Sequence, residues 1–133
     1  MLMPAVSQYM TRQPWTIDRS ATLADAHRLM RERQIRHLPV VEDQNLVGIV
    51  TLHDLHVLEL VEEFPLDTVT VDEAMTEHPF VVTGDTSLDE VVEIMAEQKY
   101  SSVIVAGRDG IEGIFTAVDA CRVLAEVLRR TAA

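Results

Sequence analysis

Two segments of the chain place a hydroxyl side chain and a carboxylate at the same spacing. Thr51 precedes Asp54 by three residues, and Thr116 precedes Asp119 in the same way. Both segments stand where an apolar stretch gives way to a helical pattern, so each pair has the form of a helix-capping box. A helix N-terminus also favours phosphate, and a carboxylate can accept hydrogen bonds from ribose hydroxyls. Taken alone, the spacing favours the cap over the nucleotide site.

The two segments belong to an internal duplication. Met10 matches Met75 at an offset of 65 residues, and Asp54 matches Asp119 at the same offset. The register holds without a gap from Val6 to Leu55 and includes Pro14 with Pro79, Leu23 with Leu88, Met30 with Met95 and Gly48 with Gly113. A fixed offset indicates a repeated structural unit. We therefore predict two domains, a first repeat over residues 1–64 and a second over residues 65–133.

Each repeat has the pattern of alternating strands and helices. An extended opening ends at a proline, and a short strand follows at 15–17 and again at 80–83. A capping-box pattern then starts a helix at Thr22 and at Ser87, with apolar residues at helical spacing. Two strands follow, predicted at 38–41 and 46–51 and at 102–106 and 111–116, and a closing helix is predicted at 52–63 and 117–130. The predicted fold class is α/β, with the order β-α-β-β-α occurring twice.

Composition excludes several classes of function. The formal net charge of −11 repels phosphate backbones, so we expect no nucleic-acid partner. Apolar runs are too short for a membrane span, and no signal peptide is expected at the N-terminus. Cys121 is the single cysteine, which excludes an internal disulfide and favours a cytoplasmic location. No nucleophile with a plausible base is found, so no catalytic residue and no enzymatic activity are predicted.

The duplication, the element order and the motifs together resemble a pair of CBS domains. The motifs are the two Met-Thr-x-x-Pro openings, the His-Leu-Pro-Val-Val strand from His37 to Val41 and the two Gly-x-x-Thr-x-x-Asp closings. The resemblance implies two repeats packed with pseudo-twofold symmetry, with clefts that bind AMP, ADP, ATP or S-adenosylmethionine. It also implies that Asp54 and Asp119 hold ribose while Thr51 and Thr116 reach phosphate.

The resemblance further implies that each cleft draws on both repeats. The residues expected to face Asp119 are Pro14, Trp15, Arg36, His37 and Leu38, and those expected to face Asp54 are Pro79, Phe80, Ser101 and Ser102. Arg36 and His37 would supply positive charge to an acidic protein, whereas their counterparts Ser101 and Ser102 are uncharged. We therefore expect phosphate-bearing ligands to prefer the cleft of Asp119.

Other chemistry-bearing side chains receive simpler interpretations. Trp15 and Phe80 occupy equivalent positions, and we expect them to pack in a core or at a domain interface in preference to stacking on a base. His53 and His56 have a spacing that metal ligands can use, but no third ligand is spaced with them, so no metal site is predicted. The repeated methionines are expected in the core.

Two functions remain open, and the melting temperature with and without nucleotide separates them. The favoured one is a regulatory module that binds an adenosyl ligand between the repeats and signals to an unknown regulated protein, with no required cofactor. The alternative is a ligand-free structural or dimerisation module. In either case a homodimer is expected, because the two closing helices carry more apolar surface than one small module covers, and CBS pairs commonly associate through them.

Overall fold

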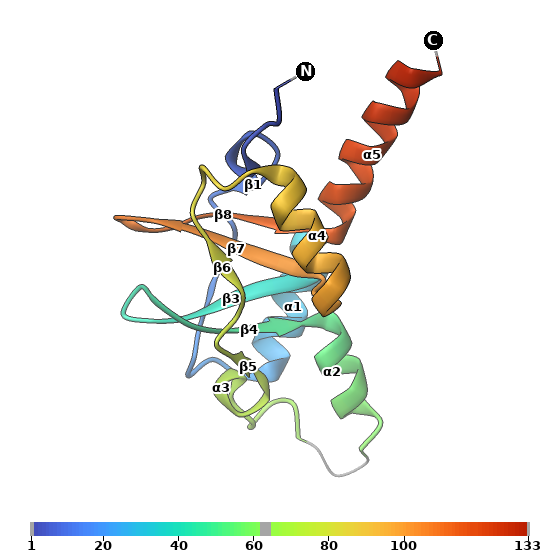
Figure 1. Ribbon diagram of the computed structural model, residues 1–133. Helices are drawn as coiled ribbons and strands as arrows, with labels where there is room; N and C mark the ends of the chain where they lie inside the picture. Colours follow the sequence, from blue (N-terminus) through green and yellow to red (C-terminus); the bar gives the residue numbers. More distant parts are fainter. Residues whose placement is uncertain (1, 62–64, 133) are drawn as a thin grey trace. The chain divides into compact units, whose positions relative to one another are not determined.

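A computed structural model describes residues 2–61 and 65–132 and shows a mixed α/β fold (Figure 1). The chain divides into two compact units, each built around one four-stranded sheet. The middle unit spans Trp15–Pro79, and the terminal unit combines Met1–Pro14 with Phe80–Ala133. Among the described residues, no helix has both the length and the apolar character needed to cross a membrane.

The middle unit has the strand order β2-β3-β4-β5, with β2 and β3 parallel and the other neighbours antiparallel. Its strands are β2 (Ile17–Asp18), β3 (His37–Glu42), β4 (Asn45–Thr51) and β5 (Thr76–Glu77). Its helices are α1 (Leu23–Arg33), α2 (Leu52–Glu59) and α3 (Val71–Ala74). The core brings α1 against the sheet, because Leu23, Ala26 and Met30 are buried at helical spacing beside Leu38 and Val50.

The terminal unit repeats this plan with the strand order β1-β8-β7-β6. Its elements are the 3-10 helix η1 (Val6–Gln8), the strands β1 (Thr11–Arg12), β6 (Val81–Val82), β7 (Ser102–Gly107) and β8 (Gly110–Thr116), and the helices α4 (Leu88–Gln98) and α5 (Ala117–Thr131). Leu88, Val91 and Met95 on α4 are buried with Val103 and Phe115 of the sheet. The predicted apolar faces of α1 and α4 are therefore confirmed as core.

The opening strands of the two repeats are exchanged between the units. Strand β1, from the first repeat, pairs with β8 of the second, and β5 pairs with β4 of the first. Each exchanged strand passes over a glycine: a Cβ on Gly113 would lie 2.8 Å from the carbonyl oxygen of Thr11, and a Cβ on Gly48 would lie 2.8 Å from that of Thr76. The compact units thus differ from the predicted repeats at 1–64 and 65–133, whose boundaries stay a prediction.

The predicted elements are present with a few differences. Each repeat also contains a short opening helix and strand, η1 with β1 and α3 with β5, which the pattern did not predict. The helix predicted over 52–63 ends at Glu59, and residues 62–64 lie outside the described part of the chain. The capping box at Thr22 is confirmed, whereas Ser87 stands at an N-cap without a side-chain hydrogen bond, so a full box was wrong there.

Candidate functional site

The candidate site in the terminal unit is the junction where β8 hands over to α5, which continues directly from the strand end (Figure 1). Thr116 is the N-cap of α5, and its Oγ1 accepts a hydrogen bond from the Asp119 amide over 3.3 Å. The Thr116 amide donates in return to Asp119 Oδ2 over 2.9 Å. The predicted capping box is confirmed, and it fixes a hydroxyl and a carboxylate side by side at a helix N-terminus.

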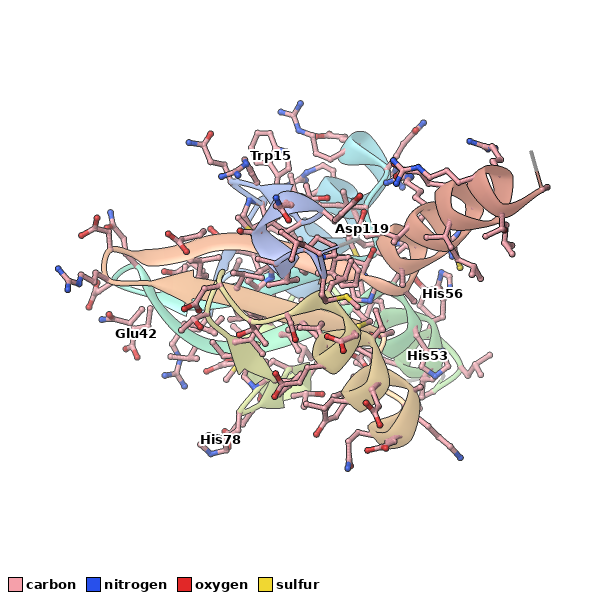
Figure 2. The ribbon with its side chains drawn as sticks, turned by 45° about the horizontal axis from the view of Figure 1, so that its top comes forward. Trp15, Glu42, His53, His56, His78 and Asp119 are labelled. Carbon is pink, nitrogen blue, oxygen red and sulfur yellow. The ribbon has the colours of Figure 1, made fainter. Side chains whose placement is uncertain are left out.

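Asp119 differs from other aspartates of the chain in its burial. Asp119 is only 6% exposed, although it lies in the first turn of α5 (Figure 2). Arg122, one turn further along α5, donates from Nη1 to Asp119 Oδ1 over 3.2 Å. The Arg122 side chain is 75% exposed, so it holds the carboxylate from the solvent side. The sequence reasoning missed Arg122, although its spacing of three residues from Asp119 is typical of a helix ion pair.

The equivalent junction in the middle unit lies between β4 and α2. Thr51 caps α2 and accepts from the Asp54 amide over 3.2 Å, and the Thr51 amide donates to Asp54 Oδ2 over 3.0 Å. Asp54 is half-buried, and the position that matches Arg122 at the 65-residue offset is Val57. The two junctions therefore share the cap and differ in the burial of the carboxylate and in its arginine partner.

Two of the remaining predicted residues of the terminal unit, Ser101 and Ser102, lie at the β8–α5 junction. Ser102 pairs with Thr116 in the β7–β8 ladder, and the carbonyl of Ser101 accepts from the Ala117 amide over 2.9 Å. Pro14 follows β1, which runs beside β8. Phe80 packs against the core of this unit and its ring lies 5.3 Å from that of Tyr100, which agrees with the packing role expected for it.

Two of the corresponding residues of the middle unit, Arg36 and His37, lie at the β4–α2 junction. His37 pairs with Thr51, the carbonyl of Arg36 accepts from the Leu52 amide over 2.9 Å, and Leu38 is buried. Pro79 lies just beyond β5, at the end of this unit.

Trp15 behaves differently from its counterpart Phe80. It is 49% exposed, with the Arg33 guanidinium 4.1 Å from its ring centroid (Figure 2). Packing in the core was therefore the wrong alternative for Trp15, whereas packing at a domain interface stays a prediction.

The predicted sites are divided between the two units. Thr116, Asp119 and Pro14 belong to the terminal unit, whereas Arg36 and His37 belong to the middle unit. Within each unit the structure brings together the cap and the start of the facing strand. The prediction that Arg36 and His37 serve Asp119 stays a prediction.

The histidines of α2 do not form a recognisable metal centre. Figure 2 shows His53 and His56 on this helix, and the ring of His56 meets that of His27 edge to face at 6.3 Å. His27 Nδ1 lies 3.5 Å from a carboxylate oxygen of Glu59. Within the part of the chain that the structure describes, no group of three or more His, Cys, Asp or Glu side chains is arranged to hold a metal ion.

A family model and several curated proteins are similar in sequence to this chain. The family model of the CBS domain matches the chain twice, over residues 6–58 and 71–126. Among curated proteins, an uncharacterized protein of Methanocaldococcus jannaschii is 30% identical over 88% of this chain and 43% of its own length. Inosine-5'-monophosphate dehydrogenase of Korarchaeum cryptofilum is 32% identical over 84% of this chain and 22% of its own length. The chain thus spans less than half the length of these relatives.

Solved structures match over more of their length. The protein CBSX2 in complex with AMP superposes with a TM-score of 0.79 at 28% identity, covering 93% of this chain and 98% of the other. The CBS domain pair of protein MJ0100, in complex with 5-methylthioadenosine and S-adenosyl-L-methionine, gives a TM-score of 0.81 at 25% identity, covering 90% and 98%. Both complexes contain adenosyl compounds.

Proposed function

Because this chain belongs to the CBS-domain family and carries two CBS domains, we propose that it is a regulatory module, not an enzyme, that binds an adenosyl ligand. The ligand class is AMP, ADP, ATP or S-adenosylmethionine. The observation that carries the proposal is the pair of Thr-x-x-Asp junctions at helix N-termini, in a chain whose matched structures hold AMP or S-adenosylmethionine. The match to inosine-5'-monophosphate dehydrogenase covers 22% of that enzyme, so it gives no support for proposing the same catalysis here.

The chemistry of the β8–α5 junction supports this ligand class. The N-terminal amides and dipole of the 15-residue helix α5 favour an anionic group such as phosphate. Asp119 Oδ2 accepts hydrogen bonds from the Thr116 amide and the Thr116 hydroxyl, and Oδ1 accepts one from Arg122, which leaves a lone pair on Oδ1 for a ribose hydroxyl. The Thr116 hydroxyl is held beside them and can turn its proton to a phosphate oxygen.

The two junctions are proposed to differ in affinity. Asp119 is buried and oriented by Arg122, whereas Asp54 is half-buried and the matching position is Val57. An oriented carboxylate loses less freedom when a ligand binds, so pre-organisation favours the β8–α5 junction. Arg36 and His37 add positive charge to the same ligand in the arrangement that the family resemblance implies.

We also propose that the chain forms a homodimer and signals to a separate regulated protein in the cytoplasm. Helix α5 supports the dimer, because residues of the apolar face predicted for it are exposed in the described part of the chain. Val118, Leu124 and Leu128 on this helix are 52%, 56% and 56% exposed. When two copies of the chain cover this face in a dimer, apolar surface is removed from water, which stabilises the association.

The exposed face of α5 also favours the second candidate function, a dimerisation module with no ligand. A thermal-melting screen separates the two functions. We expect millimolar AMP, ATP or S-adenosylmethionine to raise the melting temperature, since a ligand specific for the native state must do so. Guanosine and its monophosphate serve as controls for base selectivity. A melting temperature that stays constant with every adenosyl compound would favour the dimerisation module.

A further inference from the structure

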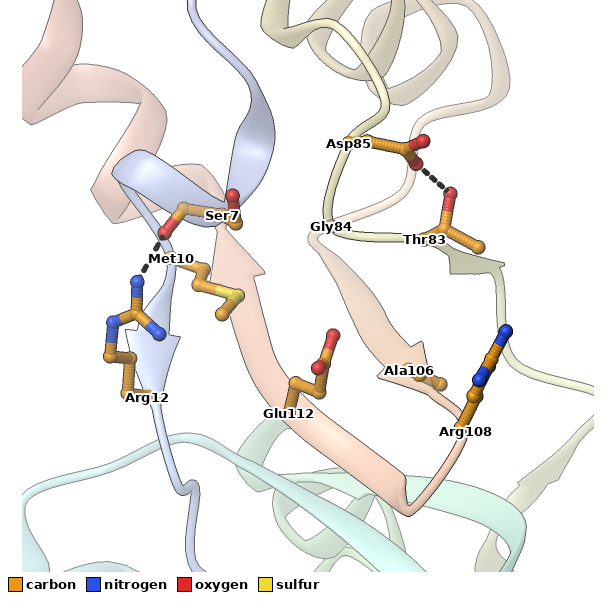
Figure 3. Close-up of a pocket in the computed structure, with 10 residues that line it drawn as sticks. Ser7, Met10, Arg12, Thr83, Gly84, Asp85, Ala106, Arg108 and Glu112 are labelled. Carbon is orange, nitrogen blue, oxygen red and sulfur yellow. Dashed lines mark hydrogen bonds between the residues drawn. The ribbon is translucent and has the colours of Figure 1, made fainter.

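A pocket lies on the terminal unit, and neither Thr116 nor Asp119 lines it. This pocket of about 680 Å³ is bounded by η1 and β1, by the loop before α4 and by the outer end of the β7–β8 hairpin (Figure 3). Side chains of both charges line it: Arg12, Arg108, Asp85 and Glu112. Figure 3 shows Glu112 pointing from β8 into the space between the two arginines.

Two glycines make room for the Glu112 carboxylate. A Cβ on Gly107 would lie 2.7 Å from Glu112 Oε2, so a side chain there would displace the carboxylate. A Cβ on Gly84 would lie 3.5 Å from Glu112 Oε1. Within residues 2–61 and 65–132, the Glu112 side chain has no hydrogen bond and no ion pair. The Glu112 carboxylate therefore has no ion-pair partner in this part of the chain, although Arg12 and Arg108 also line the pocket.

The equivalent place in the middle unit holds a cation of the protein itself. At the 65-residue offset Gly84 corresponds to Arg19 and Gly107 corresponds to Glu42. Arg19 Nη1 lies 2.9 Å from Glu42 Oε2, and Arg19 Nη2 lies 3.4 Å from Asp72 Oδ2. A guanidinium thus bridges two carboxylates where the terminal unit has its pocket.

The two repeats differ by a concerted set of substitutions at this place. Both units have a carboxylate at this place. In the middle unit it belongs to Glu42 on β3, but the equivalent residue of β7 is Gly107, and in the terminal unit the carboxylate belongs to Glu112 on β8. The position of Glu112 corresponds to Val47, which packs on the core of the middle unit. Gly84 stands at the position equivalent to Arg19, and Ser7 stands at the position equivalent to Asp72. The terminal unit therefore keeps a carboxylate receptor for a guanidinium, whereas the arginine that fills it in the middle unit is absent from the equivalent position.

We propose that this pocket binds a small free amino acid with a cationic side chain, of the arginine type, as a second ligand of the protein. The guanidinium of the ligand takes the place that Arg19 has in the middle unit and pairs with Glu112. A guanidinium matches a carboxylate with two parallel hydrogen bonds, which favours it over a simple ammonium.

The rim arginines point to a zwitterion in preference to a bare cation. Arg108 is exposed and has no ion pair among the described residues, and Arg12 is tied to the Ser7 carbonyl by one hydrogen bond of 3.3 Å. Both guanidinium groups repel a polyamine or a metal ion but attract the α-carboxylate of an amino acid. Asp85, whose Oδ1 accepts from Thr83, offers a further acceptor for the α-ammonium group.

Titration of the full chain with L-arginine tests the proposal, and two analogues divide its parts. L-Citrulline has the same shape with a neutral end, and agmatine has the guanidinium without the carboxylate. We expect L-arginine to bind in the millimolar range or tighter and both analogues to bind about tenfold more weakly, as for loss of one charge-assisted contact. Citrulline binding as tightly as arginine overturns the pairing with Glu112, and agmatine binding as tightly overturns the role of the rim.

Two variants locate the ligand. Glu112→Gln keeps the shape of the side chain and should weaken L-arginine about tenfold, while AMP affinity stays unchanged because Glu112 is not part of the β8–α5 junction. Gly84→Arg recreates the arrangement of Arg19 and should abolish L-arginine binding by filling the receptor. If the wild type does not bind L-arginine, or if Glu112→Gln binds it as tightly as the wild type, the proposal is wrong, and neither result affects the adenosyl site.

Discussion

Thr116 and Asp119 hold each other at the start of α5: the amide of each residue donates to the side chain of the other, over 2.9 and 3.3 Å. The same exchange joins Thr51 and Asp54 at the start of α2. A residue pair that caps a helix is already rigid before any ligand arrives. The cap and the proposed nucleotide site are therefore two uses of one geometry.

The caps can be weighed by removing the hydroxyl groups. Thr51→Ala and Thr116→Ala should each lower the free energy of unfolding by about 1 kcal/mol, since each leaves a helix amide without its partner. Ser87→Ala is the matched control, because Ser87 stands at an N-cap but makes no side-chain cap. Urea unfolding monitored by circular dichroism measures all three. A loss for Ser87→Ala equal to that of the threonine variants would contradict this account of the caps.

The exchanged strands predict that two glycines cannot carry a side chain. Gly48→Ala and Gly113→Ala should each destabilise the fold by about 1–3 kcal/mol, because the new Cβ would lie 2.8 Å from a backbone carbonyl that cannot move freely. Gly84→Ala is the control, since its Cβ would meet side-chain atoms alone, the nearest being the Ser7 Cβ at 3.2 Å and Glu112 Oε1 at 3.5 Å. Chemical unfolding should rank Gly84→Ala as the mildest of the three variants. The strand exchange would be contradicted if Gly113→Ala were as stable as the wild type.

Two aspartates of the middle unit predict a loss of stability in acid. Hydrogen bonds from Thr22, first from its amide and then from its hydroxyl, lower the pKa of Asp25. The Thr70 hydroxyl, followed by the Arg19 guanidinium, lowers the pKa of Asp72. A carboxyl with a lower pKa in the folded state stabilises the fold above its unfolded value, and the contribution disappears as the pH falls through the folded value. The melting temperature should therefore drop below about pH 4.

Amide substitutions test the source of this acid sensitivity. Asp25→Asn and Asp72→Asn should lower the melting temperature at neutral pH, because each removes a favoured carboxylate. Both should also flatten its fall at acid pH, because the titrating group is gone. A double variant whose acid dependence matched that of the wild type would show that other groups cause the loss.

The exposed face of α5 makes the oligomeric state testable. We expect light scattering at micromolar concentration to give the mass of a dimer. Leu124→Asp and Leu128→Asp should give the mass of a monomer, since each places a charge in the apolar contact. Arg129→Asp, on an exposed position in the same turn, is the control for a change of charge alone. A wild-type protein that is monomeric under these conditions would contradict the proposed homodimer.

Most of the fold could be predicted from the 65-residue repeat, because equivalent positions of the two repeats form equivalent helices and strands. Strands β3 and β7 begin at His37 and Ser102, which are equivalent positions, and α1 and α4 begin at the equivalent Leu23 and Leu88. The short strands β1 and β5 were not predictable from local pattern. Each has two residues and depends on pairing with a strand far away in the chain. The pairing of β1 with β8 also explains why the Met10 side chain lies beside Gly113.

The candidate site was predictable where it is local in sequence. The caps at Thr51 and Thr116 follow from spacing, and the structure places each of them at a helix N-terminus as expected. The burial of Asp119 and its contact with Arg122 depend on packing and on one rotamer of a long side chain. The cation receptor at Glu112 could not be predicted from the sequence, because residues from η1, a loop and a hairpin form it only in the folded chain.

Calorimetric titration of AMP into the wild type, Asp119→Ala and Asp54→Ala tests whether Asp119 binds the adenosyl ligand. The account predicts that the wild type binds AMP, that Asp119→Ala loses at least about tenfold in affinity with its ribose contacts, and that Asp54→Ala loses less. All three proteins are titrated well below their melting temperatures, so that loss of a cap does not unfold the chain. If Asp119→Ala binds AMP as tightly as the wild type, Asp119 is only a helix cap and the assignment of the adenosyl site is contradicted.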